Sequence, residues 1–314
     1  MAAANVEDQR LTAPEEPRRR VPFLTVVDPA GDAAFDASTP SRKEIKQNIK
    51  HLEYVCSGCG EEKRADQMKA CGRCKIARYC STQCQKSDWK RHKLDCVVPS
   101  EGGDVGQYRD VTLKLAARVG ANEALMDNIL LHSVLQLGLL RDSSLAEKYV
   151  IRVTCGNSPA DLQGYMNGLI NGDGPPEDVQ VLLTCQAIDR IPLEEAPPLV
   201  RRFEMEKRAR YIQSGGRDPF VIIYFVNEEG DMGVSIHGRP VCEAMLAYMS
   251  TKPTMEIRSA MFGTSVVPLD EKAIIQQFNN MIRMDKSNKF KLRSYPMPKP
   301  TQDPVNASIE EASS

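Results

Sequence analysis

Apolar residues in the second half of the chain recur with the periods of helices and strands. Helical spacing covers residues 109–140 and is broken at Gly120, so we predict two helices there, the second capped by Asn122. Gly138 should weaken the last turn of that second helix. Three later segments also show helical patterns: 198–212, 240–249 and 270–284.

Runs of β-branched and aromatic residues alternate with these helices. They cover 149–153, 179–184 and 220–226, and the last is apolar enough to lie buried in a sheet. Residues 227–231 contain a glycine and predict a hairpin loop into a strand at 233–236. We therefore predict an α+β fold in which residues 107–295 form one mixed domain, with about 190 residues to bury a core of its own.

The remaining segments have polar or turn-forming composition. Residues 1–50 contain five scattered prolines and predict a largely disordered segment, apart from a short helix at 41–52 that Ser41 and Glu44 would cap. Residues 97–106 are typical of a linker. The proline-rich residues 296–314 predict a disordered tail.

Composition narrows the classes of partner. The chain has 314 residues, with 41 basic and 42 acidic side chains and a net charge of -1. It therefore lacks the global positive field that drives non-specific binding of nucleic acid, which we expect not to be a partner. No apolar run approaches the roughly 18 residues of a membrane span, and no signal-peptide core begins the chain. We expect no membrane contact and an intracellular location, in the nucleus or the cytoplasm.

Cysteine usage indicates a metal site between the predicted disordered segment and the mixed domain. Seven of the ten cysteines fall in 41 residues, beside one histidine, and no secretion signal favours disulfides. The candidate ligands are Cys56, Cys59, Cys71, Cys74, Cys80, Cys84, His92 and Cys96. Eight such donors make two tetrahedral zinc sites with filled shells, which leave no position for an activated water. The pattern therefore favours two structural zinc ions over catalytic zinc.

The spacing of the ligands suggests how they are presented. The two C-x2-C pairs suit tight turns, whereas Cys80 with Cys84 and His92 with Cys96 stand one helical turn apart. Spacing alone permits either sequential or interleaved sites. Because so short a segment cannot close a core, metal binding should supply its folding free energy, on the order of 10 kcal/mol per zinc.

The residues between and beside the ligands resemble the MYND finger. The resemblance is carried by the eight ligand positions together with Tyr79, Ser81, Gln85, Asp88, Trp89 and Lys93. Only the eleven-residue gap between Cys59 and Cys71 is long for that family. The resemblance places a finger at residues 51–98 and implies interleaved sites: Cys56, Cys59, Cys80 and Cys84 on one zinc, and Cys71, Cys74, His92 and Cys96 on the other.

The resemblance also implies a function in binding partner proteins. MYND fingers serve chiefly as docking sites for short proline-containing peptides, and the groove residues of that family match Gln85 and Trp89. A lone Trp in a small rigid module offers a large apolar face and an N–H donor, which suits a binding anchor, although Trp89 could instead pack the small core of the finger. Ten basic and five acidic residues, with seven thiolates and two Zn²⁺, leave the finger a charge of about +2. This surplus suits an acidic-flanked peptide, or simply a solvated surface.

Enzymatic alternatives have less support in the sequence. MYND fingers also occur inserted in SET methyltransferase domains, but only 55 residues precede Cys56 and the Asn-His pair of that catalytic core is absent. His237 and Cys242 lie close enough in sequence for a base and a nucleophile, yet we expect Cys242 to be an ordinary buried cysteine. We likewise expect His132 to be a core residue.

The sequence therefore predicts a zinc-binding adaptor without catalytic residues. One alternative is an enzyme in the mixed domain to which the finger recruits substrate, and another is contact of the finger with nucleic acid.

Overall fold

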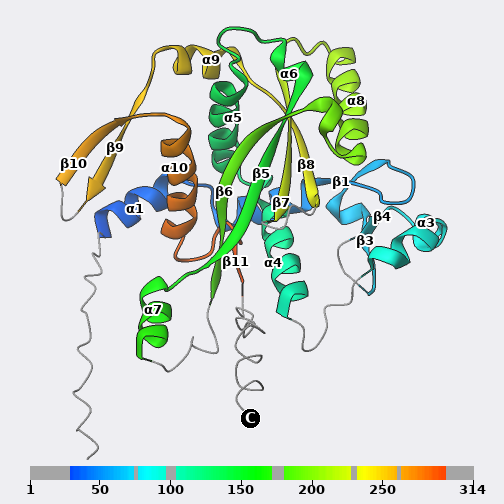
Figure 1. Cartoon of the computed structure of the whole chain (residues 1–314), viewed down its shortest axis with the longest axis horizontal. Coiled ribbons are helices and arrows are strands. Elements are labelled where there is room, and N and C mark those ends of the chain that lie inside the picture. The colour runs from blue at the N-terminus through cyan, green and yellow to red at the C-terminus, as the bar shows by residue number, and fades with distance from the viewer. Residues whose placement is uncertain are drawn as a thin grey trace, which may run out of the picture.

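The computed structural model describes residues 29–73, 77–96, 104–171, 180–227, 232–259 and 263–294 (Figure 1). Its α-helices are α1 (Pro29–Ser38), α2 (Arg42–His51), α3 (Thr82–Asp95), α4 (Asp104–Val119), α5 (Glu123–Leu137), α6 (Leu145–Lys148), α7 (Leu162–Asn171), α8 (Pro198–Gln213), α9 (Glu243–Ser250) and α10 (Glu271–Met284). Its strands are β1 (Glu53–Val55), β2 (Glu62–Arg64), β3 (Lys69–Ala70), β4 (Arg78–Tyr79), β5 (Tyr149–Pro159), β6 (Val181–Pro192), β7 (Phe220–Asn227), β8 (Met232–Pro240), β9 (Thr254–Ser259), β10 (Gly263–Pro268) and β11 (Arg293–Ser294).

A five-stranded mixed sheet is the centre of the larger domain. Its strand order is β11-β6-β5-β7-β8, and only β5 and β7 run parallel. Helices α4, α5 and α10 pack against one face, and α8 covers the other next to β7 and β8. The predicted class, an α+β domain after a small finger, is confirmed.

The central strand β7 shows why the sequence identifies it so clearly. Val221, Ile223 and Phe225 belong to the apolar core beneath α4, α5 and α10. The alternate residues, among them Ile222 and Tyr224, pack instead in the second core beneath α8. A strand covered on both faces has no polar positions to alternate with, so it is apolar throughout.

The two helices predicted within 109–140 are confirmed. α4 ends at Val119, and the side chain of Asn122 accepts a hydrogen bond from the backbone N–H of Leu125 at the start of α5. The role expected of Gly138 was wrong, because this residue terminates α5 in the left-handed conformation, at φ 70°. Glycine is the residue that adopts this conformation at least cost.

The predicted disorder of residues 1–50 is wrong for the part that the structure describes. α1 (Pro29–Ser38) is helical, and its Phe35 packs edge-on against Phe290 with ring centroids 5.9 Å apart. The helix predicted at 41–52 is confirmed as α2, including both hydrogen bonds of the capping box between Ser41 and Glu44. Residues 1–28 and the predicted tail at 296–314 lie outside the described residues.

Several elements escaped the sequence reading. The strand predicted at 149–153 continues to Pro159, and α7 and the β9–β10 hairpin fall where no element was predicted. The hairpin of β7 and β8 is present, although its loop at 228–231 is outside the described residues. Figure 1 places the finger and the β9–β10 hairpin at opposite sides of the central sheet. None of the described helices is long and apolar enough to cross a membrane.

Candidate metal centres

Short strands and one helix form the scaffold of the finger. β1 pairs with β2 and β3 pairs with β4, and α3 follows the second pair. The turn between β1 and β2 needs two glycines. Gly60 has φ 77°, and a Cβ on Gly58 would lie 2.6 Å from the carbonyl oxygen of Cys84. These glycines bring the first C-x2-C pair against the start of α3.

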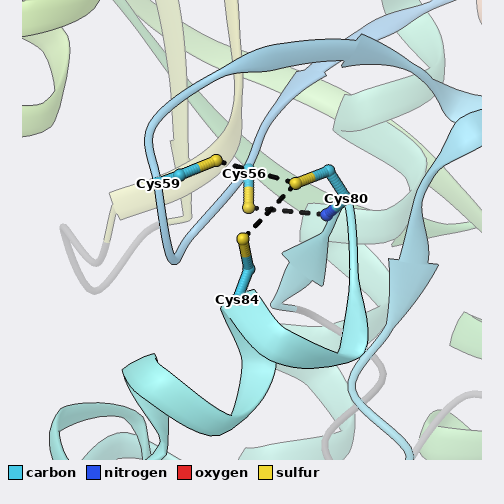
Figure 2. A group of neighbouring side chains, drawn as sticks. All are labelled: Cys56, Cys59, Cys80 and Cys84. Carbon is cyan, nitrogen blue, oxygen red and sulfur yellow. Dashed lines mark hydrogen bonds between the residues drawn. The ribbon is translucent and has the colours of Figure 1, made fainter.

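The first cluster consists of the sulfurs of Cys56, Cys59, Cys80 and Cys84, which lie within 4.8 Å of one another (Figure 2). Cys59 Sγ is 3.6 Å from Cys80 Sγ, which is 3.5 Å from Cys84 Sγ. The side chains point toward a common centre from the β1–β2 turn, from the residue after β4 and from the first turn of α3. Residues separated by up to 28 positions are thereby combined in one site.

The electrostatics of this cluster favour a bound cation. Burial opposes ionisation of Cys56, but backbone N–H groups of Cys59, Cys80 and Gly58 lower its pKa to about 7. The neighbouring sulfurs of Cys84, Cys59 and Cys56 raise the pKa of Cys80 to about 12. Four sulfurs this close repel one another as thiolates, and a metal ion removes that repulsion by binding all four.

The second cluster consists of Cys71, His92 and Cys96, all three of them buried. Cys71 Sγ and Cys96 Sγ are 3.9 Å apart. Cys71 directly follows β3, His92 lies in the last turn of α3, and Cys96 is the C-cap residue of that helix. The predicted fourth ligand of this site, Cys74, lies outside the described residues. The two clusters therefore interleave along the chain.

The sulfur–sulfur distances fit tetrahedral zinc. With Zn–S bonds of about 2.3 Å, two ligands of a tetrahedron are about 3.8 Å apart, which the observed 3.5–3.9 Å distances bracket. Disulfide bonds would bring sulfurs to about 2.05 Å. Both donor sets therefore fit zinc, and the structure holds two candidate zinc sites in one finger.

Hydrogen bonds tie α3 to the rest of the finger. The hydroxyl of Tyr79 donates to Asp88 Oδ2 at 2.9 Å, and Arg91 Nε donates to Asp88 Oδ1 at 2.9 Å. Arg91 also donates from Nη2 to the carbonyl oxygen of Ser57, in the first ligand turn. These contacts fix the orientation of the helix that carries ligands of both clusters.

The predicted peptide-binding residues lie on the outer part of α3. Gln85 and Trp89 are one helical turn apart, and Gln85 is half-buried. Trp89 is 39% exposed and contacts the ring of His92 edge-on, with centroids 6.0 Å apart. It is absent from the apolar core of the finger, to which buried Tyr79 contributes its ring.

The candidate catalytic residues of the larger domain are not brought together by any hydrogen bond that the structure records. His237 is buried on β8, where its Nε2 bonds to the hydroxyl of Ser235 at 2.5 Å. The expectation that Cys242 is buried was wrong: it is exposed at the N-cap position of α9. His132 is buried on α5 within the core, as expected.

An ion-pair network between the finger and the larger domain had no distinct signal in the sequence. Lys207 of α8 lies 2.8 Å from a carboxylate oxygen of Glu53 and 2.6 Å from one of Glu62. Arg210 approaches Glu62 to 3.2 Å. Beside this network, a cavity of about 220 Å³ is lined by residues of the finger, α8 and β8, including His237. The charged residues that pair here lie far apart in the sequence, and no periodic pattern in the sequence predicts which of them meet.

Apolar packing continues the same junction. Ala117 of α4 and Ala121, in the turn after α4, belong to the cluster that contains Leu52 and Tyr54 at the base of the finger. The finger therefore sits on the larger domain through both ion pairs and apolar contacts.

Interleaved Cys and His clusters on two short hairpins and one helix define a small zinc finger. Residues 56–96 match the family model of the MYND finger, so this part of the chain is a MYND zinc finger. No solved structure matches the chain.

Similar curated proteins share a short stretch with the chain. N-lysine methyltransferase SMYD2 of Gallus gallus is 40% identical over 68 residues, which are 22% of this chain and 15% of that protein. The SET domain and MYND-type zinc finger protein 6 of Schizosaccharomyces pombe is 52% identical over 46 residues, 15% of this chain and 9% of that protein. The chain thus spans less than a fifth of the length of these relatives.

Proposed function

We propose that the protein is a zinc-dependent adaptor whose MYND finger binds a short, proline-containing peptide segment of a partner protein. In this proposal each chain carries two structural zinc ions, the second completed by Cys74. Closed shells of sulfur and nitrogen ligands give the metals no open position for substrate. A rigid finger held in this way suits recognition better than chemistry.

The exposure of Trp89 is the observation that supports this proposal most. A large aromatic side chain that packs a core is normally covered, whereas Trp89 remains 39% exposed on a helix that contributes residues to both candidate zinc sites. An exposed indole offers a wide apolar face together with an N–H donor, which is the usual profile of an interface anchor. Gln85, one turn earlier, adds an amide that can bond to a peptide backbone.

Replacement of Trp89 tests the peptide site. We expect Trp89→Ala to keep its zinc and its fold but to lose most of the partners that the wild-type chain captures from a cell lysate, because truncating an interface anchor typically costs about 2 kcal/mol or more. Quantitative mass spectrometry of the captured proteins measures the loss. Leu94→Ala is the matched control, since Leu94 is an exposed apolar residue of the same helix. A Trp89→Ala protein that captures the wild-type set would refute the peptide site.

The methyltransferase activity in the names of some relatives is not part of this proposal. Those relatives share with the chain a stretch of 46 to 82 residues, at most 17% of their own length. The polar groups beside the junction cavity also bond to one another: Lys207 to two carboxylates, and His237 to Ser235. We therefore assign no catalytic residue.

A further inference from the structure

Positively charged side chains from three parts of the chain converge where α2, α4 and the loop before β11 meet. Arg118 of α4 is half-buried, and its Nη1 donates to the carbonyl oxygen of Lys291 at 2.7 Å. Arg42 of α2 donates from Nη2 to the carbonyl oxygen of Ser287 at 3.3 Å. Two guanidinium groups are thereby held against one short loop.

Two lysines complete the group. Lys46 lies one turn after Arg42 on α2, and Lys291 lies in the loop itself. The pKa of the Lys291 ammonium is lowered, mainly by burial and further by the nearby positive charges of Arg42, Arg118 and Lys46. The four side chains, Arg42, Lys46, Arg118 and Lys291, are called the basic cluster below.

No member of the basic cluster forms an ion pair with any described acidic residue. Other cations of the same region do: Lys289 lies 2.8 Å from a carboxylate oxygen of Asp36. The charge of Asp285 opposes the lowering of the Lys291 pKa. The carboxylate oxygens of Asp285, however, accept hydrogen bonds from the backbone N–H groups of Lys289 and Phe290, each at 2.7 Å. Like charges that converge without a counterion destabilise the fold, and such an arrangement is relieved by an anionic ligand.

We propose that the basic cluster is a second docking site, which binds an acidic peptide segment of a partner protein. Four cations in a compact group suit two or three carboxylates of a peptide. Nucleic acid is bound through long tracks of cations, which a chain of net charge -1 does not favour. The site shares no residue with the finger, so this proposal does not depend on the peptide site at Trp89.

The position of the basic cluster supports its use by an adaptor. In sequence, Arg118 lies between Ala117 of α4 and Ala121 of the turn after it, two residues that belong to the apolar cluster at the base of the finger. One partner that carries a proline-containing segment and an acidic segment could therefore contact both sites. Two linked contacts raise affinity beyond that of either alone.

Fluorescence anisotropy with the zinc-loaded full chain tests this site directly. The probe is a fluorescein-labelled peptide of about ten residues in which Glu alternates with Ser. We expect Lys46→Gln/Lys291→Gln to weaken binding about tenfold at low salt, because two of the four positive charges of the cluster are lost. The double variant Lys148→Gln/Lys272→Gln is the matched control, because it removes two exposed lysines outside the cluster and should bind like wild type.

Further variants separate the alternatives. Lys46→Arg/Lys291→Arg keeps the charges and should keep the affinity, and Trp89→Ala should bind this probe like wild type. Failure of the wild-type chain to bind the probe, or undiminished binding by the glutamine double variant, would overturn the proposal. So would stronger binding of a DNA oligonucleotide of equal charge. A more than tenfold gain in affinity on removal of residues 297–314 would make the chain's own acidic tail the occupant, against the partner assigned here.

Discussion

His132 and His237 are buried and form no ion pair with a carboxylate of the described residues, which links the stability of the fold to pH. Burial lowers the pKa of His132 to about 4, even though the charge of Asp189 opposes this shift. Burial, with Arg239 and Lys207 nearby, lowers the pKa of His237 to about 3. In the unfolded chain both imidazoles have a pKa of about 6.5. The neutral form is therefore favoured in the folded state.

Acidification should destabilise the protein through these two groups. Between pH 6.5 and their folded-state pKa values the unfolded chain binds more protons, so stability is lost as the pH falls through that window. We expect His132→Leu to reduce the loss of unfolding free energy between pH 7 and pH 5 by about 1–2 kcal/mol. Urea unfolding at both pH values measures this difference. His51→Leu, which replaces an exposed histidine, should keep the wild-type pH dependence, and an unchanged dependence in His132→Leu would contradict the account.

Some residues could be assigned from the sequence and others could not. Zinc ligands have fixed chemistry and short spacings, so the eight candidates stand out, and the structure gathers seven of them into two clusters. Exposure depends on contacts between remote segments. For this reason the sequence left the environment of Trp89 open and misplaced Cys242, whose exposure follows from its position at the start of α9.

At the level of elements, the sequence predicted helices and strands well where burial or a capping residue determines the pattern of apolar and polar positions. β7 is covered on both faces and α5 has a clear cap, so both were predicted close to their observed bounds. β5 was predicted too short because its second half contains Thr154, Gly156 and Asn157, which have low apolar character. α1 was missed because its anchors, Phe35 against Phe290 and Asp36 paired with Lys289, are contacts with residues far along the chain.

The contact between α8 and the finger is an element-scale feature that can be tested. Lys207 neutralises Glu53 and Glu62, and the Glu62 side chain is only 7% exposed. We expect Lys207→Met to lower the free energy of unfolding by about 1–3 kcal/mol, because a nearly buried carboxylate loses its closest cation. Urea denaturation measures the change. Lys148→Met, at an exposed lysine that forms no ion pair in the described part of the chain, should leave stability near the wild-type value; equal stability of the two variants would refute the role of Lys207.

On the scale of the whole molecule, the finger and the larger domain share one junction. Ala117 and Ala121 extend the apolar cluster of the finger to α4 and the turn after it, and α8, also of the larger domain, adds ion pairs to Glu62 of the finger. The proposed peptide site on α3 and the basic cluster on α2 and α4 are thus held in a fixed relation. Loss of the metals should therefore disturb the junction as well as the finger, because metal binding supplies most of the folding free energy of so small a unit.

Zinc content is the most direct test of this account. Metal analysis of the purified full chain by inductively coupled plasma mass spectrometry should find two zinc ions per chain. Cys80→Ser should retain about one, since Cys80 lies between Cys59 and Cys84 in the first cluster and the second cluster shares none of its ligands. Wild-type protein that is folded but contains no stoichiometric zinc would contradict the central claim.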